Sequence, residues 1–160
     1  MLQGRTMREK LMAYMGLKDV LRQGWVNAGV EQPESVAAHS WGMAVLALKL
    51  CPQHLDLTRV LTMCLVHDLP EVVVGDLTPS DDRSTKAKDE RAAMANLAPE
   101  WVEILDEYEA QSTEEAVFVR SLDKLDMALQ AHVYMSRTGL DLAPFIESAR
   151  AVLGEHPFLE

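Results

Sequence analysis

Apolar residues recur at helical spacing along most of this chain, and this period is the feature that most restricts its fold. Met7, Leu11 and Met15 open the first such segment, at 7–22. The further segments with this pattern are 35–50, 58–68, 86–97, 100–109, 113–137 and 141–153. No segment alternates apolar and polar residues over the length of a strand, and the VVVG run at 72–75 is too short to carry a sheet. We therefore predict an all-α fold, a bundle of about six helices.

Local signals mark where these helices begin and end. Pro52 ends the second segment, because proline cannot continue a helix. The sequence STEE at 112–115 is a capping box that opens the longest helix, which Gly139 closes. The stretches 25–34 and 75–85 are rich in residues that favour turns, and we expect loops there.

Length and charge restrict the possible partners. A chain of 160 residues suits one domain, 1–160, with a core of its own. The formal net charge of −10 argues against a nucleic-acid polymer, although a small anionic ligand is possible where a metal supplies positive charge. The sequence has no run of 18 apolar residues, no signal-peptide pattern and no cysteine framework for disulfides. We therefore expect a cytoplasmic protein with no membrane partner.

Two of the five histidines, His39 and His67, lie inside apolar helical sequence. A buried imidazole needs a partner, because an unpaired buried polar group is costly. Asp68 follows His67 directly, where a helix ends and its dipole disfavours a carboxylate. A bound cation would neutralise this carboxylate and accept the imidazole lone pair. The alternative is that each histidine is an ordinary core residue with a hydrogen-bonded partner.

A fourth ligand is expected from the long segment 113–137. Asp123 and Asp126 both lie among its apolar residues, and spacing alone does not choose between them. Two histidines and two aspartates offer nitrogen and oxygen ligands, which suit Mn, Fe, Co, Ni or Zn better than Ca or Mg. His132 lies nine residues beyond Asp123 and so faces the other side of the helix. We therefore expect one divalent transition metal with room for water and a substrate oxygen.

The motifs around these residues resemble a known family. The chain has RQGWVNAGVEQPESVAAHSW at 22–41, VHDLPEVVVGDLTP at 66–79 and EYEAQSTEEAVFVRSLDKLDMALQA at 107–131. Together these segments are similar to the YfbR-like 5′-deoxynucleotidases of the HD-domain superfamily and to their eukaryotic relatives. The similarity extends from about residue 8 to about residue 137. It implies an HD-type helical bundle, a metal-dependent phosphohydrolase acting on deoxyribonucleoside 5′-monophosphates, and a homodimer.

The resemblance also implies which residues hold the metal. The matching positions are His39, His67, Asp68 and Asp123. This match, rather than spacing, favours Asp123 over Asp126 as the fourth ligand.

Further roles follow from the same motifs. Glu71 matches the acid of HDxxE, a carboxylate assigned to catalysis, which can orient the attacking water or move a proton. Asp76 matches the acid of the GD motif, placed to assist proton transfer or to contact the nucleotide. Trp25 matches an aromatic residue of the nucleotide pocket. Arg22, in the RxGW pattern of the eukaryotic relatives, and Lys124 are candidates to balance phosphate charge.

Three positions depart from the family pattern. Gly24 stands where bacterial nucleotidases have an arginine directly before the tryptophan. Ala38 replaces an acidic residue before the first histidine, so a residue that supports the metal ligands is missing or replaced. Gly42 stands where relatives often carry a larger, frequently basic residue. The absence of this side chain would widen or re-aim the substrate pocket.

Other functions are compatible with the same residues. One is an HD phosphodiesterase or nucleotide pyrophosphohydrolase acting on another small nucleotide. Another is a weakly active module that only binds nucleotides. A third is a structural helical protein without metal, whose stability would not respond to chelators.

Overall fold

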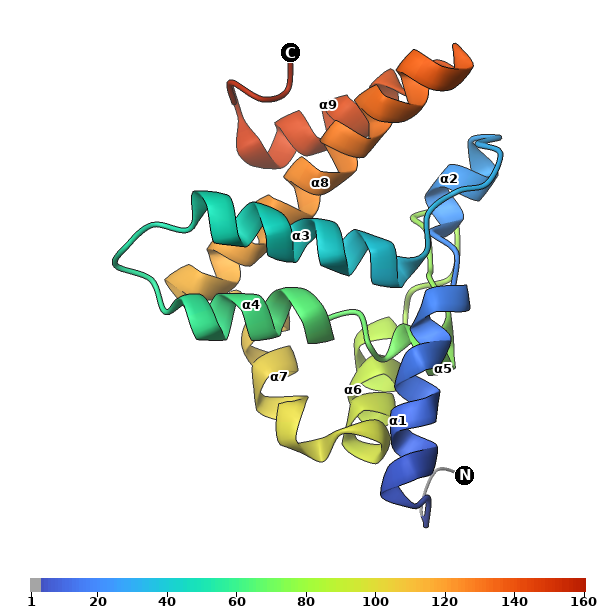
Figure 1. The fold of residues 1–160 in the computed structure, drawn as a ribbon, viewed down its shortest axis with the longest axis vertical. Coiled ribbons are helices and arrows are strands. Elements are labelled where there is room, and N and C mark those ends of the chain that lie inside the picture. Colours follow the sequence, from blue (N-terminus) through green and yellow to red (C-terminus); the bar gives the residue numbers. More distant parts are fainter. Residues whose placement is uncertain (1–3) are drawn as a thin grey trace.

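The longest helix, α8 (Glu114–Thr138), is the element against which several neighbouring helices pack (Figure 1). It begins after Thr113, whose side chain accepts a hydrogen bond from the backbone N–H of Ala116, one residue later than the capping box predicts. It ends at Gly139, where φ is 72°, as glycine allows. The buried positions Ala116, Val119, Leu122, Leu125, Ala128, Ala131 and Tyr134 repeat every three residues and form the face toward the core.

The computed structural model describes residues 4–160. The other α-helices are α1 (Met7–Met15), α2 (Gln23–Asn27), α3 (Val36–Leu50), α4 (Leu57–Val66), α5 (Glu71–Val74), α6 (Lys86–Leu97), α7 (Val102–Ala110) and α9 (Ala143–Leu153). Two 3₁₀ helices cover Gly16–Asp19 and Pro99–Trp101. Across the described range the only β-type pairing is an isolated bridge between Leu21 and Ser35. The predicted all-α class is confirmed, and α2 and α5 are too short to give a periodic signal in the sequence.

Helices α3 and α4 form an antiparallel pair that packs on the N-terminal half of α8 (Figure 1). Their shared core is apolar and fully buried, with Met43, Ala47, Val60, Met63, Cys64, Ala116 and Val119 among its members. Helix α9 returns along the other half of α8, so one long helix joins two separate packing regions. Burial of these side chains, rather than helix propensity, supplies most of the stability of such helices.

The chain breaks where α4 meets α5. Helix α4 ends at Val66, His67 is its C-terminal cap, and Pro70 precedes α5. This break separates His67 and Asp68, at the end of α4, from Glu71, the first residue of α5. No helix in residues 4–160 is both long and apolar enough to cross a membrane.

Candidate metal centre

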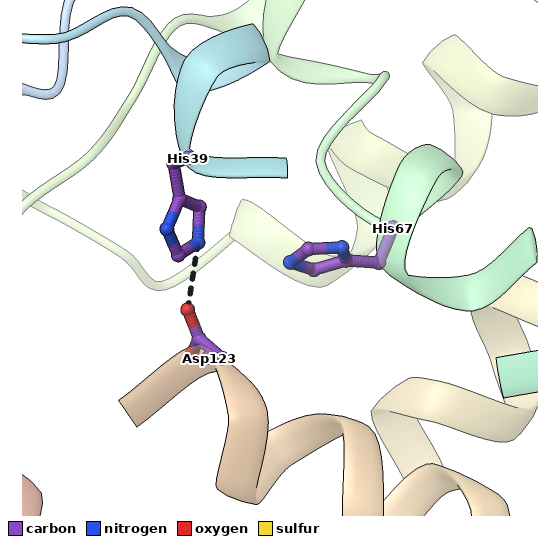
Figure 2. Close-up of side chains that lie close together, drawn as sticks. All are labelled: His39, His67 and Asp123. Carbon is purple, nitrogen blue, oxygen red and sulfur yellow. Dashed lines mark ion pairs between the residues drawn. The ribbon is translucent and has the colours of Figure 1, made fainter. Parts of the chain in front are cut away.

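Three helices bring His39, His67 and Asp123 together (Figure 2). His39 lies in the first turns of α3, which is fixed by the side chain of Ser35 accepting from the N–H of Ala38. His67 caps α4, and Asp123 lies in the interior of α8. Both imidazoles are buried, and ligand atoms of the three side chains lie within 4.8 Å of one another. The structure thus places three of the four residues expected to hold a metal in one compact group.

The fourth, Asp68, lies at the edge of this group. Its Oδ2 is 3.1 Å from Nε2 of His67 and 3.8 Å from Nε2 of His39. Asp68 follows the C-terminal cap of α4, and its side chain is 15% exposed, compared with 21% for Asp123. Burial opposes ionisation of this carboxyl group, but His67 and His39 lower its pKa to about 2. It is therefore an anion directed toward both imidazoles.

The hydrogen bonds of the two imidazoles leave their Nε2 atoms free to bind a cation. Nδ1 of His67 lies 3.1 Å from the carbonyl oxygens of Met63 and Cys64, which can only accept, so this nitrogen carries the proton. Nδ1 of His39 lies 2.7 Å from Oδ2 of Asp126. Partners of this kind on the second ring nitrogen are typical of histidines that bind metals. Asp126 thus contacts the opposite side of the His39 ring from Asp123.

The residues present fit a divalent cation. Nε2 of His39 is buried and lies 2.8 Å from Oδ1 of Asp123, in a direction that makes no hydrogen bond. Burial and Arg22 oppose protonation of His39, yet Asp123 and Asp126 raise its pKa to about 9. Despite its burial, Asp123 has a pKa well below its usual range, because His39 lies beside it. The carboxylates thus favour a positive charge at this place, which a metal ion can supply in place of the imidazole protons, and the mixed nitrogen and oxygen donors suit a transition metal.

Glu71 is the first residue of α5 and is buried, although it bears a carboxyl group. Its Oε2 has no hydrogen-bond partner within the described chain. Burial, and then the carboxylates of Asp68 and Asp76, raise the pKa of Glu71 to about 10. A carboxyl group held in its neutral form beside a metal-type cluster is typical of a group that transfers protons.

Asp76 connects the loop after α5 to the start of α2. Its Oδ2 accepts a hydrogen bond of 2.8 Å from the backbone N–H of Gln23. Because Arg22 directly precedes Gln23, this hydrogen bond also holds the backbone of Arg22 near Asp76. Burial disfavours a charge on Arg22, but Asp123, Asp68 and Asp76 raise the pKa of its guanidinium further above its usual value. Arg22 is therefore a permanent cation facing the carboxylates of the site.

Trp25 is almost fully buried rather than openly exposed in the pocket. Its Nε1 donates to Oε1 of Glu34 at 3.0 Å. Its ring packs on Phe145 of α9, with 4.3 Å between ring centroids, and meets the edge of Tyr134. A side chain added at Gly24 would press on Phe145, with 3.3 Å between the new Cβ and Cε1. The departure at Gly24 therefore makes room for an aromatic residue from α9.

A cavity of about 810 Å³ joins these features. Arg22, Trp25, His67, Asp68, Glu71, Asp76, Asp123 and Lys124 all line it. Sequence reasoning missed other lining residues, including Arg83, Lys86, Glu90, Tyr108, Arg120, Met127, Pro144 and Phe145. None was given a role, although Tyr108, Arg120 and Met127 lie within the segment 107–131 that carries the family resemblance. The i,i+4 spacing of Lys86 and Glu90, which form an ion pair, was also a usable signal.

The expectation that Gly42 widens this cavity is wrong. Gly42 is not among the residues that line it. The space that a side chain would need at Gly42 is filled by the carboxylate of Asp126.

The fold and this centre together define a class: all-helical proteins in which histidines and aspartates from separate helices form a metal-type cluster at a cavity. Residues 15–156 match the family model described as HD domain. The chain therefore belongs to the HD domain family.

Curated relatives are similar over most of this chain. The protein named 5′-deoxynucleotidase HDDC2 of Bos taurus is 43% identical over 128 residues, which cover 74% of this chain and 62% of that protein. The protein of the same name from Dictyostelium discoideum is 34% identical over 167 residues, covering 90% and 87%. The chain thus spans less than two thirds of the length of the bovine relative.

Solved structures share the arrangement of helices. A protein from Pyrococcus horikoshii has a TM-score of 0.85 and 35% identity, covering 92% of this chain and 90% of that one. A protein from Magnetospirillum magnetotacticum, described as a predicted metal-dependent phosphohydrolase, has a TM-score of 0.67 and 26% identity, covering 91% and 88%.

Proposed function

We propose that this chain is a metal-dependent phosphohydrolase that removes phosphate from nucleoside 5′-monophosphates, with a preference for the deoxyribonucleotides. The observation that carries the proposal is the position of a buried, neutral Glu71 beside the cluster of His39, His67 and Asp123, in one cavity with the cation Arg22. The names of the curated relatives support the substrate class.

In this proposal His39, His67, Asp68 and Asp123 hold one divalent transition metal. When bound, the metal supplies positive charge to polarise a phosphoryl oxygen and lowers the pKa of a coordinated water. The Nε2 atoms of both histidines are available for this, since their Nδ1 atoms have other partners. Mn, Fe, Co, Ni and Zn all suit such a donor set.

In this proposal Glu71 and Asp76 transfer protons during attack by the water. Glu71 is close enough to Asp68 and Asp76 for all three carboxyl groups to influence one another's charge. Held neutral by its raised pKa, Glu71 can donate a proton to the leaving oxygen of the sugar, and the carboxylate that this produces can then accept a proton from the attacking water. Asp76 also fixes the start of α2 through its hydrogen bond to Gln23.

The nucleotide would lie along the cavity. Arg22 and Lys124 both line the cavity, and their cationic side chains would neutralise the phosphate. Met127, Pro144 and Phe145 line the same cavity and offer an apolar surface for the base. Trp25, which packs beneath Phe145, supports this surface rather than forming all of it.

We also propose that residues 1–160 act as one HD domain in a cytoplasmic homodimer. Exposed apolar side chains of α3, Trp41, Val45 and Leu48, follow one stripe of the helix and are the surface we expect a second copy to cover. Free thiols at Cys51 and Cys64 suit a reducing compartment. Analytical ultracentrifugation of the wild type and of Trp41→Ser tests the dimer, which the variant should weaken.

The activity is tested by phosphate release from a panel of nucleoside 5′- and 3′-monophosphates. The protein is stripped of metal and resupplied with Mn²⁺, Co²⁺, Ni²⁺, Zn²⁺ or Mg²⁺. Metal-dependent release from 5′-deoxyribonucleotides supports the proposal. Release only from cyclic or pyrophosphate-linked nucleotides points to a phosphodiesterase or pyrophosphohydrolase instead. Metal binding without any turnover points to a module that only binds nucleotides.

A further inference from the structure

Gly42 occupies the interior of α3, a position where glycine weakens a helix. It lies three residues after His39 and therefore on the same side of the helix. A Cβ atom at this position would lie 2.1 Å from Oδ1 and 3.1 Å from Cγ of Asp126. Such contacts are impossible without moving the carboxylate. The backbone of α3 and the side chain of Asp126 thus fit together only because residue 42 has no side chain.

Asp126 makes one ion pair in the described chain, with His39. Its Oδ2 is 2.7 Å from Nδ1 of His39, and its side chain is only 13% exposed. The imidazole it contacts is fully buried and holds its other nitrogen toward Asp123. A carboxylate in this position fixes both the tautomer and the direction of the ring.

We propose that Gly42 and Asp126 act together as positioning residues for the metal centre. The missing side chain at Gly42 lets Asp126 reach His39, and Asp126 then holds Nε2 of His39 as an unprotonated donor toward the cation. The inference rests on the proposed metal centre but not on the substrate. It also explains how His39 is supported although Ala38 carries no carboxylate.

A second possible cation site, formed in part by the same residues, is less favourable. Glu34, His39 and Asp126 also have potential ligand atoms within 4.8 Å of one another. Oε1 of Glu34, however, already accepts a hydrogen bond from Trp25, and Nδ1 of His39 is paired with Asp126. Because these two atoms already have partners, the three residues suit a cation less well than the group of His39, His67 and Asp123 does.

A double-mutant cycle tests the proposal, with Co²⁺ as the probe and isothermal titration calorimetry as the readout. Gly42→Ala and Asp126→Ala should each lower Co²⁺ affinity by roughly 10- to 100-fold, the usual cost of removing a partner of a metal-bound histidine. In the Asp126→Ala background, Gly42→Ala should lower affinity no further, since the carboxylate it displaces is gone. Asp126→Asn, which keeps an oxygen acceptor for Nδ1, should recover part of the affinity.

The melting temperature of the metal-free proteins separates positioning from general damage. Gly42→Ala should lower it in the wild type but raise it in the Asp126→Ala background, where only the gain in helix propensity remains. Gly16→Ala is the control, because its Cβ would meet a methyl group of Val72, at 3.0 Å, rather than the site. It should leave Co²⁺ affinity unchanged.

Four outcomes would overturn the proposal. The first three are unchanged Co²⁺ affinity in Gly42→Ala, equal losses in both backgrounds, and two Co²⁺ ions per chain with one lost in Asp126→Ala. A wild type that binds no Co²⁺ also overturns it. Co²⁺ binding with the expected cycle but no phosphate release leaves this inference standing and contradicts the proposed phosphohydrolase activity instead.

Discussion

The polar and the apolar parts of the cavity wall are built in different ways. In the polar part, buried side chains come from helix interiors and helix ends, and His67 is fixed through the carbonyl oxygens of α4. In the apolar part, Phe145 from α9 and Trp25 from α2 meet through ring packing. Polar groups demand specific partners when buried, whereas apolar surfaces accept many neighbours. We therefore expect changes in the polar part to abolish activity and changes in the apolar part to tune it.

The largest effect is expected from Asp68→Ala. Loss of a metal ligand should cost more than removal of a supporting partner, so phosphate release should fall by over ~100-fold. The rate is measured with the best nucleotide of the panel and saturating Co²⁺. Asp19→Ala, at an exposed aspartate outside the cavity, is the control and should keep the wild-type rate. An active Asp68→Ala would contradict its assignment to the centre.

Glu71→Gln should lower the rate by about 10²- to 10⁴-fold, the usual contribution of a general acid or base. Co²⁺ affinity should stay at the wild-type level, because Glu71 moves protons and does not hold the metal in this account. Glu90→Gln is a matched control, since Glu90 is also buried and lines the same cavity. If both variants lose activity equally, the catalytic role of Glu71 is wrong.

Removal of the metal should have a moderate effect on stability. A cation that binds only the folded state stabilises it by about 2.7 kcal/mol at a hundredfold excess over Kd. For a chain of this size this is a rise in melting temperature of roughly 5–10 °C. Calorimetric scans with and without a chelator measure it. An unchanged melting temperature would favour a structural role without metal.

Phe145→Ala should have the smallest effect. The base loses part of its apolar contact, so KM should rise by roughly 3- to 10-fold while kcat changes little. Phe158→Ala removes a phenylalanine that is 47% exposed and does not line the cavity, and it serves as the control. If Phe145→Ala lost as much kcat as Glu71→Gln, the polar and apolar parts of the cavity wall would not differ in the way expected here.

This contrast also explains what could be predicted from the sequence. His39 and His67 were detectable because polar side chains inside apolar helices need a partner, whereas only the family resemblance distinguished Asp123 from Asp126. The structure brings His39, His67 and Asp123 together. The all-helical class followed from the period of the apolar residues. The contact between Asp126 and His39 was not predicted, since it depends on how α3 crosses α8 and on the room left at Gly42. Phe145 has no sequence signal, because an aromatic residue in an amphipathic helix usually belongs to the core.

The most direct test of the metal centre is anomalous diffraction from crystals grown with Co²⁺. The account predicts one strong peak per chain, bonded at about 2.0–2.2 Å to the Nε2 atoms of His39 and His67 and to carboxylate oxygens of Asp68 and Asp123. It also predicts Asp126 on Nδ1 of His39, away from the ion. A peak bonded to Glu34 and Asp126, or an active protein with no peak at the centre, would contradict it.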